Sequence, residues 1–123
     1  MYHVRVDRQK NRLYISIKDR IDDVEVDLVS EEIFLALDEL QQGFTVITDL
    51  SDAIPVSPQV SERLQRILLA LSQKGLKKAV RVVQNIVGAM QLKRLYEESE
   101  LTYHVIQATS MEEAERILNE DDA

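Results

Sequence analysis

Residues 44–75 read FTVITDLSDAIPVSPQVSERLQRILLALSQKG, and this stretch decides the fold. Its first residues, 44–48, form a short apolar run that suits a central strand. Ser57 is a good N-cap and Pro58 a good first residue for the amphipathic helix that follows. The connecting loop opens with Asp49-Leu50-Ser51. In α/β folds a loop that leads from a strand to a helix is where functional surfaces form.

The residues before this stretch predict a hairpin and a helix. Alternating apolar residues indicate strands over 2–7 and 13–17, joined by a short polar turn. From Asp22 the apolar period becomes helical, and Gly43 is the expected end of that helix.

The residues after Gly75, the expected end of the second helix, repeat the alternation of strand and helix. Strands are expected over 79–84 and 103–107, with a third helix over 85–99 between them. Ser110 and Glu113 have capping-box spacing and open the last helix. The predicted order is therefore β-β-α-β-α-β-α-β-α, an α/β fold with a mostly parallel five-stranded sheet, an N-terminal hairpin and four helices.

Polar residues interrupt the strands at alternate positions. Thr45, Arg81 and His104 are examples, and a sheet buried on both faces tolerates few of them. We therefore expect the helices to lie on one face, with the other face partly open or covered by a partner. An edge strand or an open face also invites symmetric pairing, so a homodimer is a candidate state.

Composition sets the class of the chain. Its 123 residues, 45% of them hydrophobic and 30% charged, suit one domain, 1–123, with an ordered core over about 2–120. The absence of cysteine excludes disulfides and thiolate sites. A net charge of −7 disfavours nucleic acid and anionic membranes, and no apolar run reaches the length of a membrane span. A cytoplasmic location is the expectation.

The predicted order, an N-terminal hairpin followed by helices and strands in alternation, resembles the STAS family, which includes SpoIIAA-like anti-sigma-factor antagonists and the cytoplasmic tails of sulfate transporters. The resemblance covers residues 2–120, and two short segments carry it. Residues 46–51, VITDLS, are similar to the family's strand ending in Asp-Leu-Ser, and residues 110–114, SMEEA, to its last-helix opening. The resemblance implies a SpoIIAA-like fold and a regulatory, non-enzymatic domain that binds a protein partner, such as a kinase-like or sigma-related regulator.

One departure from the family concerns its phosphorylation switch. Members switched by phosphorylation show Asp-Ser-Ser-Gly at the start of the second helix, where this chain has Ser57-Pro58-Gln59-Val60. The place of the phosphoacceptor serine falls on Gln59, so the resemblance implies a domain without the usual switch. Ser57 and Ser61 are the remaining phosphorylation candidates. Ser57 is the stronger of the two, because a phosphate on an N-cap meets free backbone amides and the helix dipole. Its ordinary interpretation is a plain N-cap.

A partner-binding surface is expected around the 51–56 loop and the exposed face of the second helix. Ile54 and Val56 flank a proline, and apolar loop residues can anchor an interface. The candidate partner-binding residues are Asp49, Ser51, Ile54, Val56, Gln59, Glu62, Arg63 and Arg66.

Two rival functions remain open at this point. One is a small-molecule or lipid site in a cavity between helices and sheet. The other is an enzyme that uses Asp49 with a carboxylate of the Asp19, Asp22 and Asp23 cluster, which could also attract Mg²⁺. The ordinary interpretation is that the cluster favours a helix N-terminus and that Asp49 orders its own loop by accepting the amides of Ser51 or Asp52. No phosphate-loop, dinucleotide, zinc-hydrolase or nucleophile-elbow motif is present, so we predict no catalytic residue, cofactor or metal.

Overall fold

The computed structural model describes residues 1–52, 57–83 and 104–121. Its elements are, in chain order, β1 (Tyr2–Asp7), β2 (Arg12–Ile17), α1 (Asp23–Leu37), β3 (Thr45–Asp49), α2 (Pro58–Gln73), β4 (Lys78–Val82), β5 (His104–Ala108) and α4 (Met111–Asp121). The third helix predicted over 85–99 lies outside the described residues. None of the helices described is long and apolar enough to cross a membrane.

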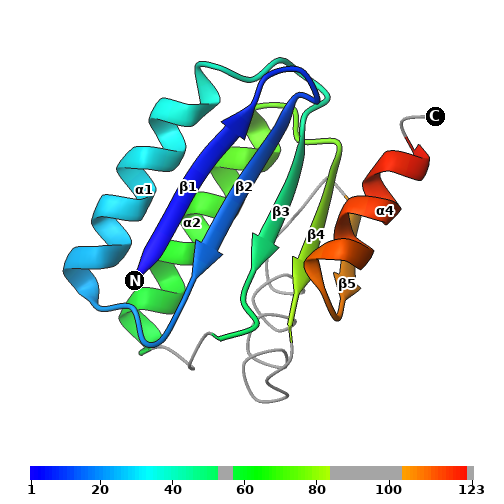
Figure 1. Ribbon diagram of the computed structural model, residues 1–123. Coiled ribbons are helices and arrows are strands. Elements are labelled where there is room, and N and C mark those ends of the chain that lie inside the picture. The colour runs from blue at the N-terminus through cyan, green and yellow to red at the C-terminus, as the bar shows by residue number, and fades with distance from the viewer. Residues whose placement is uncertain (53–56, 84–103, 122–123) are drawn as a thin grey trace.

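The strands form one sheet in the order β1-β2-β3-β4-β5 (Figure 1). β1 and β2 pair antiparallel as the predicted hairpin, and every later neighbour is parallel. Because each parallel neighbour follows through a crossover, the sheet grows outward from the hairpin one strand at a time. The mostly parallel five-stranded sheet predicted from the sequence is confirmed.

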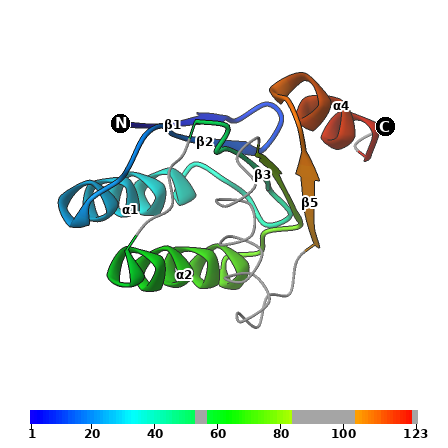
Figure 2. The same ribbon diagram turned by 90° about the horizontal axis from the view of Figure 1, so that it is seen from below.

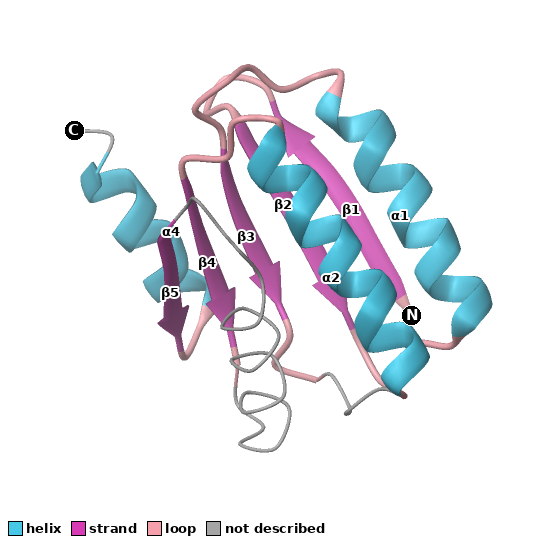
Figure 3. Cartoon of the chain, turned by 180° about the vertical axis from the view of Figure 1, so that it is seen from behind, coloured by secondary structure: helices cyan, strands magenta, loops and turns pink. Residues whose placement is uncertain are grey.

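Helices cover both faces of this sheet, so the prediction of helices on one face alone was wrong. α1 and α2 lie on one face and α4 on the other, as Figure 2 shows, and the view from behind places α1 and α2 side by side (Figure 3). Val46 faces the core under α1 and α2, whereas its neighbour Ile47 packs with Ala114 and Leu118 of α4. The apolar stripe of α4 needs a surface to bury it, and the second face supplies one.

Two of the polar strand residues that prompted the one-face prediction, Thr45 and Arg81, are buried. Thr45 is 5% exposed and Arg81 is 6% exposed. Thr45 faces α4, where the guanidinium of Arg12 donates from Nε to its Oγ1 over 3.2 Å. Thr45 is thus a buried polar group that is hydrogen-bonded, as buried polar atoms generally are.

α1 ends six residues earlier than the sequence pattern predicted. Its last helical residue is Leu37, and the next backbone amides, of Asp38, Glu39 and Leu40, bond to the carbonyl three residues back. No basic residue stands in its last turn, and two acidic residues follow it. Negative charge at the negative end of the helix dipole opposes further helix. Leu40 still packs against the core, which explains why it matched the helical period.

α2 ends as predicted, in a Schellman motif at Gly75. The amide of Gly75 donates to the carbonyl of Ser72, and the amide of Leu76 donates to that of Leu71, both over 3.3 Å. Gly75 has a φ of +97°, a backbone conformation that glycine adopts without penalty. Leu76 is 5% exposed and joins the core, which supplies the apolar contact that this helix ending favours.

The start of α4 confirms the predicted capping box, with one change. Oγ of Ser110 accepts from the amide of Glu113 over 3.1 Å. The carboxylate of Glu113 accepts in return from Thr109, through its amide (3.0 Å) and its hydroxyl (2.7 Å). These bonds lower the pKa of Glu113, the backbone bond from Thr109 having the largest effect.

Candidate functional site

The parallel strands end at one edge of the sheet, where the loop after β3 begins (Figure 1). Asp49 orders the first turn of this loop. Its Oδ1 accepts hydrogen bonds from the backbone amide of Ser51 (3.1 Å) and from the hydroxyl of Ser51 (2.7 Å). This contact confirms the loop-ordering role predicted for Asp49. Since one carboxylate oxygen already accepts two hydrogen bonds, Asp49 resembles a structural residue more than a poised general base.

Two loops and the end of β4 are joined at this edge by backbone hydrogen bonds. The amide of Asp19, in the loop after β2, donates to the carbonyl of Asp52 over 2.9 Å. The amide of Leu50 donates to the carbonyl of Val82, at the end of β4, over 2.8 Å. Asp19 has a φ of +58°, a left-handed conformation that Asp tolerates better than most residues. The start of the 51–56 loop is therefore held against its neighbours.

The acidic cluster before α1 serves the helix. Asp22 is the N-cap, and its side chain accepts from the amide of Glu25 over 2.8 Å, while Asp23 lies in the first turn, where negative charge is favoured. Within 1–52, 57–83 and 104–121, no group of three or more His, Cys, Asp or Glu residues is arranged to hold a metal ion. Helix capping accounts for this part of the cluster without a cation.

Ser57 is the N-cap of α2, as predicted. Its backbone is extended, Pro58 follows as the first helical residue, and its Oγ accepts from the amide of Val60 over 3.3 Å. The residue is exposed. Its phosphorylation stays a prediction.

Removing the Ser57 cap should destabilise the domain. We expect Ser57→Ala to lower the free energy of unfolding by about 1 kcal/mol, because the amide of Val60 loses its acceptor. Ser57→Asp should retain most of the stability, since aspartate caps equally well and favours the positive end of the helix dipole. Urea denaturation compares the three proteins, and equal stability of alanine and aspartate variants would show that the cap contributes nothing.

The exposed face of α2 presents three of the predicted partner-binding residues. Gln59, Glu62 and Arg66 are exposed. Glu62 and Arg66 form an i,i+4 ion pair of 3.2 Å, with side chains 66% and 75% exposed. Such an exposed ion pair contributes little to stability. Both side chains can therefore leave it at a small cost in free energy and form ion pairs with a partner protein instead.

Arg63 differs from these three residues. Its Nη1 donates to the carbonyl of Asp23 over 2.9 Å and to the carboxylate of Asp27 over 3.1 Å. Arg63 thus ties α2 to α1, a role that sequence reasoning did not anticipate, and a substitution there would change helix packing. The apolar anchors proposed from sequence, Ile54 and Val56, lie outside the described residues.

A buried ion pair under α4 escaped the sequence analysis. Arg12 of β2 is 0% exposed, and its Nη1 donates to Oε2 of Glu115 over 2.7 Å. Both terminal nitrogens of Arg12 also reach Oδ1 of Asn119 over 3.3 Å, while Nε donates to Thr45. Glu115 and Asn119 are spaced by one helical turn, which places them on the same side of α4. The pair locks α4 to the sheet across 103 positions of sequence.

Tyr14 extends this polar cluster toward β1. The guanidinium carbon of Arg5 lies 3.7 Å from the centre of the Tyr14 ring, a cation–π contact. Burial, and then a hydrogen bond with Glu115, raise the pKa of Tyr14. Partial burial raises the pKa of Glu115, but the bond from Tyr14 and the charges of Arg12 and Lys10 outweigh it, so that the pKa is lowered. Glu115 is therefore an ionised structural group at neutral pH.

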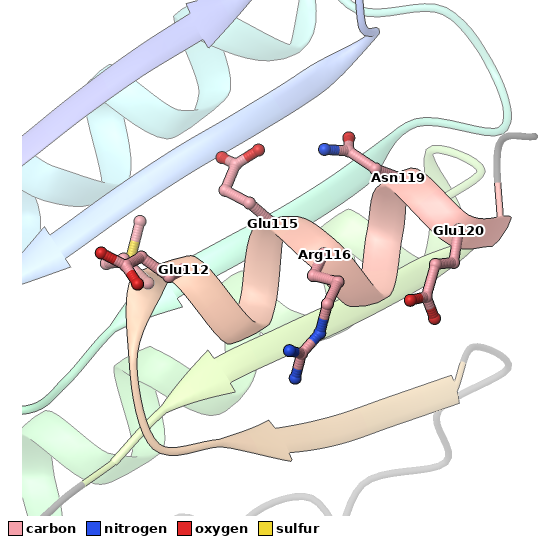
Figure 4. Close-up of a pocket in the computed structure, with 6 residues that line it drawn as sticks. Glu112, Glu115, Arg116, Asn119 and Glu120 are labelled. Atoms are coloured by element: carbon pink, nitrogen blue, oxygen red, sulfur yellow. The ribbon is translucent and has the colours of Figure 1, made fainter.

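A shallow depression runs along α4 and is lined by residues of this helix alone. In Figure 4, Glu115 and Asn119 project toward β2, whereas Arg116 and Glu120 project to the opposite side. The lining residues are Met111, Glu112, Glu115, Arg116, Asn119 and Glu120. A depression walled by one helix does not enclose a ligand, and it lies away from the helix-to-sheet cavity that the small-molecule hypothesis needs.

No family model matches the sequence, and no curated protein matches it. Solved structures match over most of the chain. An uncharacterized protein with a SpoIIAA-like fold from Shewanella loihica has a TM-score of 0.74 at 11% identity, over 95% of this chain and 93% of that one. An anti-sigma factor antagonist from Mycobacterium paratuberculosis has a TM-score of 0.61 at 12% identity, over 97% and 95%.

A third similar structure is the complex of the diguanylate cyclase SiaD with its activator SiaC from Pseudomonas aeruginosa. The matched chain has a TM-score of 0.58 at 11% identity, over 88% of this chain and 93% of that one. Identities this low establish the fold. The chain has a SpoIIAA-like α/β fold, and the SpoIIAA-like fold predicted from the sequence is confirmed.

Proposed function

We propose that this domain is a regulator that acts by binding a protein partner and catalyses no reaction. The observation that carries the proposal is the exposed face of α2 formed by Gln59, Glu62 and Arg66, which follows in the chain the loop start that Asp49 and Ser51 order. Two proteins of similar structure support the proposal, because both act on other proteins: one is an anti-sigma factor antagonist, and the other is the activator SiaC in complex with a diguanylate cyclase.

Preorganisation of this surface favours binding. The Asp49–Ser51 bonds and the Asp19–Asp52 bond hold the start of the loop before any partner arrives, which reduces the ordering entropy that binding would otherwise cost. The exposed charges on α2 can then select a partner by complementarity. We assign Ile54 and Val56 the role of apolar anchors between these two charged and polar parts.

The partner class that we propose is a kinase-like or sigma-related regulator in the cytoplasm, with Ser57 as the residue open to phosphorylation. The usual serine of the family's switch is replaced by Gln59, so a partner that binds without modifying the domain is the simpler arrangement. A homodimer is a further proposal, through β1 or β5, the two edge strands of the described sheet.

Reversing the α2 ion pair tests the binding surface. We expect Glu62→Arg with Arg66→Glu to abolish capture of proteins that the wild-type domain retains from its native host, since both charges change sign. Stability should change by less than about 0.5 kcal/mol, because both side chains are exposed. Affinity capture with identification by mass spectrometry is the measurement, and the same spectra report any phosphate on Ser57.

The matched control reverses two exposed charges on the opposite face of the sheet, Glu112→Arg with Arg116→Glu on α4. This control should retain every partner of the wild type. If the α2 variant and the α4 control capture the same proteins, the α2 surface is not the binding site. If the wild type captures none, the regulatory proposal fails.

A further inference from the structure

The outer face of α1 is unusually apolar for a surface helix. Val24 is 67% exposed, Leu28 45% and Leu35 69%. These residues stand four and seven positions apart, so they form one stripe along the helix. The opposite side of α1 buries Val26, Val29, Ile33 and Ala36 against the sheet. A helix that is apolar on two opposite sides is normally covered on both.

A fourth exposed apolar residue of α1, Phe34, lies on the side of the helix toward α2. It is 46% exposed and stands seven positions after Asp27, the residue that Arg63 of α2 contacts, so it lies on the same side of α1 as that contact. We name the set of Val24, Leu28 and Leu35 the α1 stripe. Val24 and Leu35 are about 16 Å apart along the helix axis, which is three turns.

Acidic residues border the α1 stripe. The helix contains Asp23, Glu25, Asp27, Glu31 and Glu32 and no lysine or arginine. Glu31 and Glu32 are exposed and stand between Leu28 and Leu35 in the sequence. An apolar ridge with acidic borders is complementary to an apolar ridge with basic borders.

We propose that the α1 stripe binds an amphipathic helix whose apolar side is flanked by lysine and arginine, supplied by a partner protein. Helices pack on helices by setting side-chain ridges into grooves, and three turns of α1 match a partner helix of about the same length. The occupant is neither an anionic membrane, which the acidic border would repel, nor a symmetric second α1, which would bring acid against acid.

This surface is distinct from the α2 surface proposed above. The two proposals fail separately, because the variants that test them lie on different helices.

The test uses designed peptides of about 16 residues that are labelled with a fluorophore. The first has leucines at helical spacing with lysine and arginine beside them, and the second has the same composition in scrambled order. A third keeps the leucine pattern and carries glutamate in place of the basic residues. Fluorescence anisotropy measures each affinity, and amide shifts of the isotope-labelled protein locate the binding site. We expect only the first peptide to bind, with shifts along α1 and none at residues 49–52.

Two variants of the protein define the contact. Leu28→Asp with Leu35→Asp removes apolar area from exposed positions, and Glu31→Lys with Glu32→Lys reverses the border. Each should weaken the binding of the first peptide at least about tenfold. Circular dichroism should show that each variant is folded at the temperature of the binding measurement, although Leu35→Asp adds a negative charge to the last turn of α1 and should lower the melting temperature. The α2 pair reversal, Glu62→Arg with Arg66→Glu, should leave peptide affinity unchanged.

Equal binding of the ordered and scrambled peptides would overturn the proposal, because charge alone would then explain it. Unchanged affinity of the Leu28→Asp, Leu35→Asp variant would overturn it as well. Sedimentation that shows a wild-type dimer, lost in that variant, would assign the α1 stripe to a second copy of this chain and overturn the proposed occupant.

Discussion

Replacing Glu115 by alanine is expected to lower the free energy of unfolding by about 2–3 kcal/mol. The fully buried guanidinium of Arg12 would lose the carboxylate that lies 2.7 Å from its Nη1. Thr45 and Asn119 remain as partners, but neither is charged. Removal of one member of a buried ion pair costs about 3–5 kcal/mol, and the 26% exposure of the Glu115 side chain lets water replace part of the interaction.

Chemical denaturation measures this loss, and two further variants show its origin. Glu112→Ala removes an exposed carboxylate one turn earlier on the same helix and should change stability by less than about 0.5 kcal/mol. Arg12→Met with Glu115→Met replaces the whole pair by apolar groups and should be more stable than Glu115→Ala alone. If Glu115→Ala and Glu112→Ala behave alike, the buried pair does not hold α4.

The pH dependence of this loss has a definite sign. The pKa of Glu115 is lowered in the folded chain from its ordinary value of 4.5. A depressed carboxylate contributes stability that is present above its unfolded pKa and is lost as pH falls through the folded pKa. The difference in free energy of unfolding between the wild type and Glu115→Ala should therefore be largest at neutral pH, near pH 7, and should decrease below about pH 4.5.

Replacing Gly75 by alanine is expected to cost about 2 kcal/mol. Its φ of +97° is unfavourable for any residue with a Cβ, and such backbone conformations cost of order 1–3 kcal/mol. The added Cβ would also stand 2.6 Å from Cγ and 3.4 Å from Cα of Gln42. The Gln42 side chain must therefore move, and the neighbouring backbone limits the movement.

Gly43 provides a matched control for this substitution. Its φ is +88°, close to that of Gly75, but an added Cβ there would meet nothing within 4 Å. We expect Gly43→Ala to cost about 1 kcal/mol from backbone strain alone. Thermal unfolding of both variants gives the difference, which measures the crowding at Gln42. Equal losses of stability in the two variants would mean that the Gln42 side chain moves away without cost and that backbone strain explains both losses.

Local signals in the sequence predicted the local structure well. The N-cap at Ser57, the Schellman ending at Gly75 and the capping box at Ser110 each depend on groups within a few residues of one another. Backbone geometry relates such groups directly, so the residue types alone indicate the contact. Asp49 follows the same logic, because its two partners belong to a residue two positions away.

Longer-range features depended on the assembled sheet. The apolar periodicity predicted a helix that continues beyond Leu37, because Leu40 packs against the core although it is not helical. The same pattern could not show that Arg63 reaches α1. In both cases the position of a neighbouring element decides what a side chain contacts, and the spacing within one segment contains no information about that neighbour.

The sequence by itself determined the order of the described strands and helices and their caps, because propensity, periodicity and capping act over a few residues. The SpoIIAA-like architecture was implied by the resemblance of that order to a known family. Only the tertiary structure decided that α4 covers the second face and that Arg12 is buried there against Glu115. The two residues are 103 positions apart. Whether a charged residue at an alternate strand position faces water or an ion partner depends on which helix the folded chain brings over it.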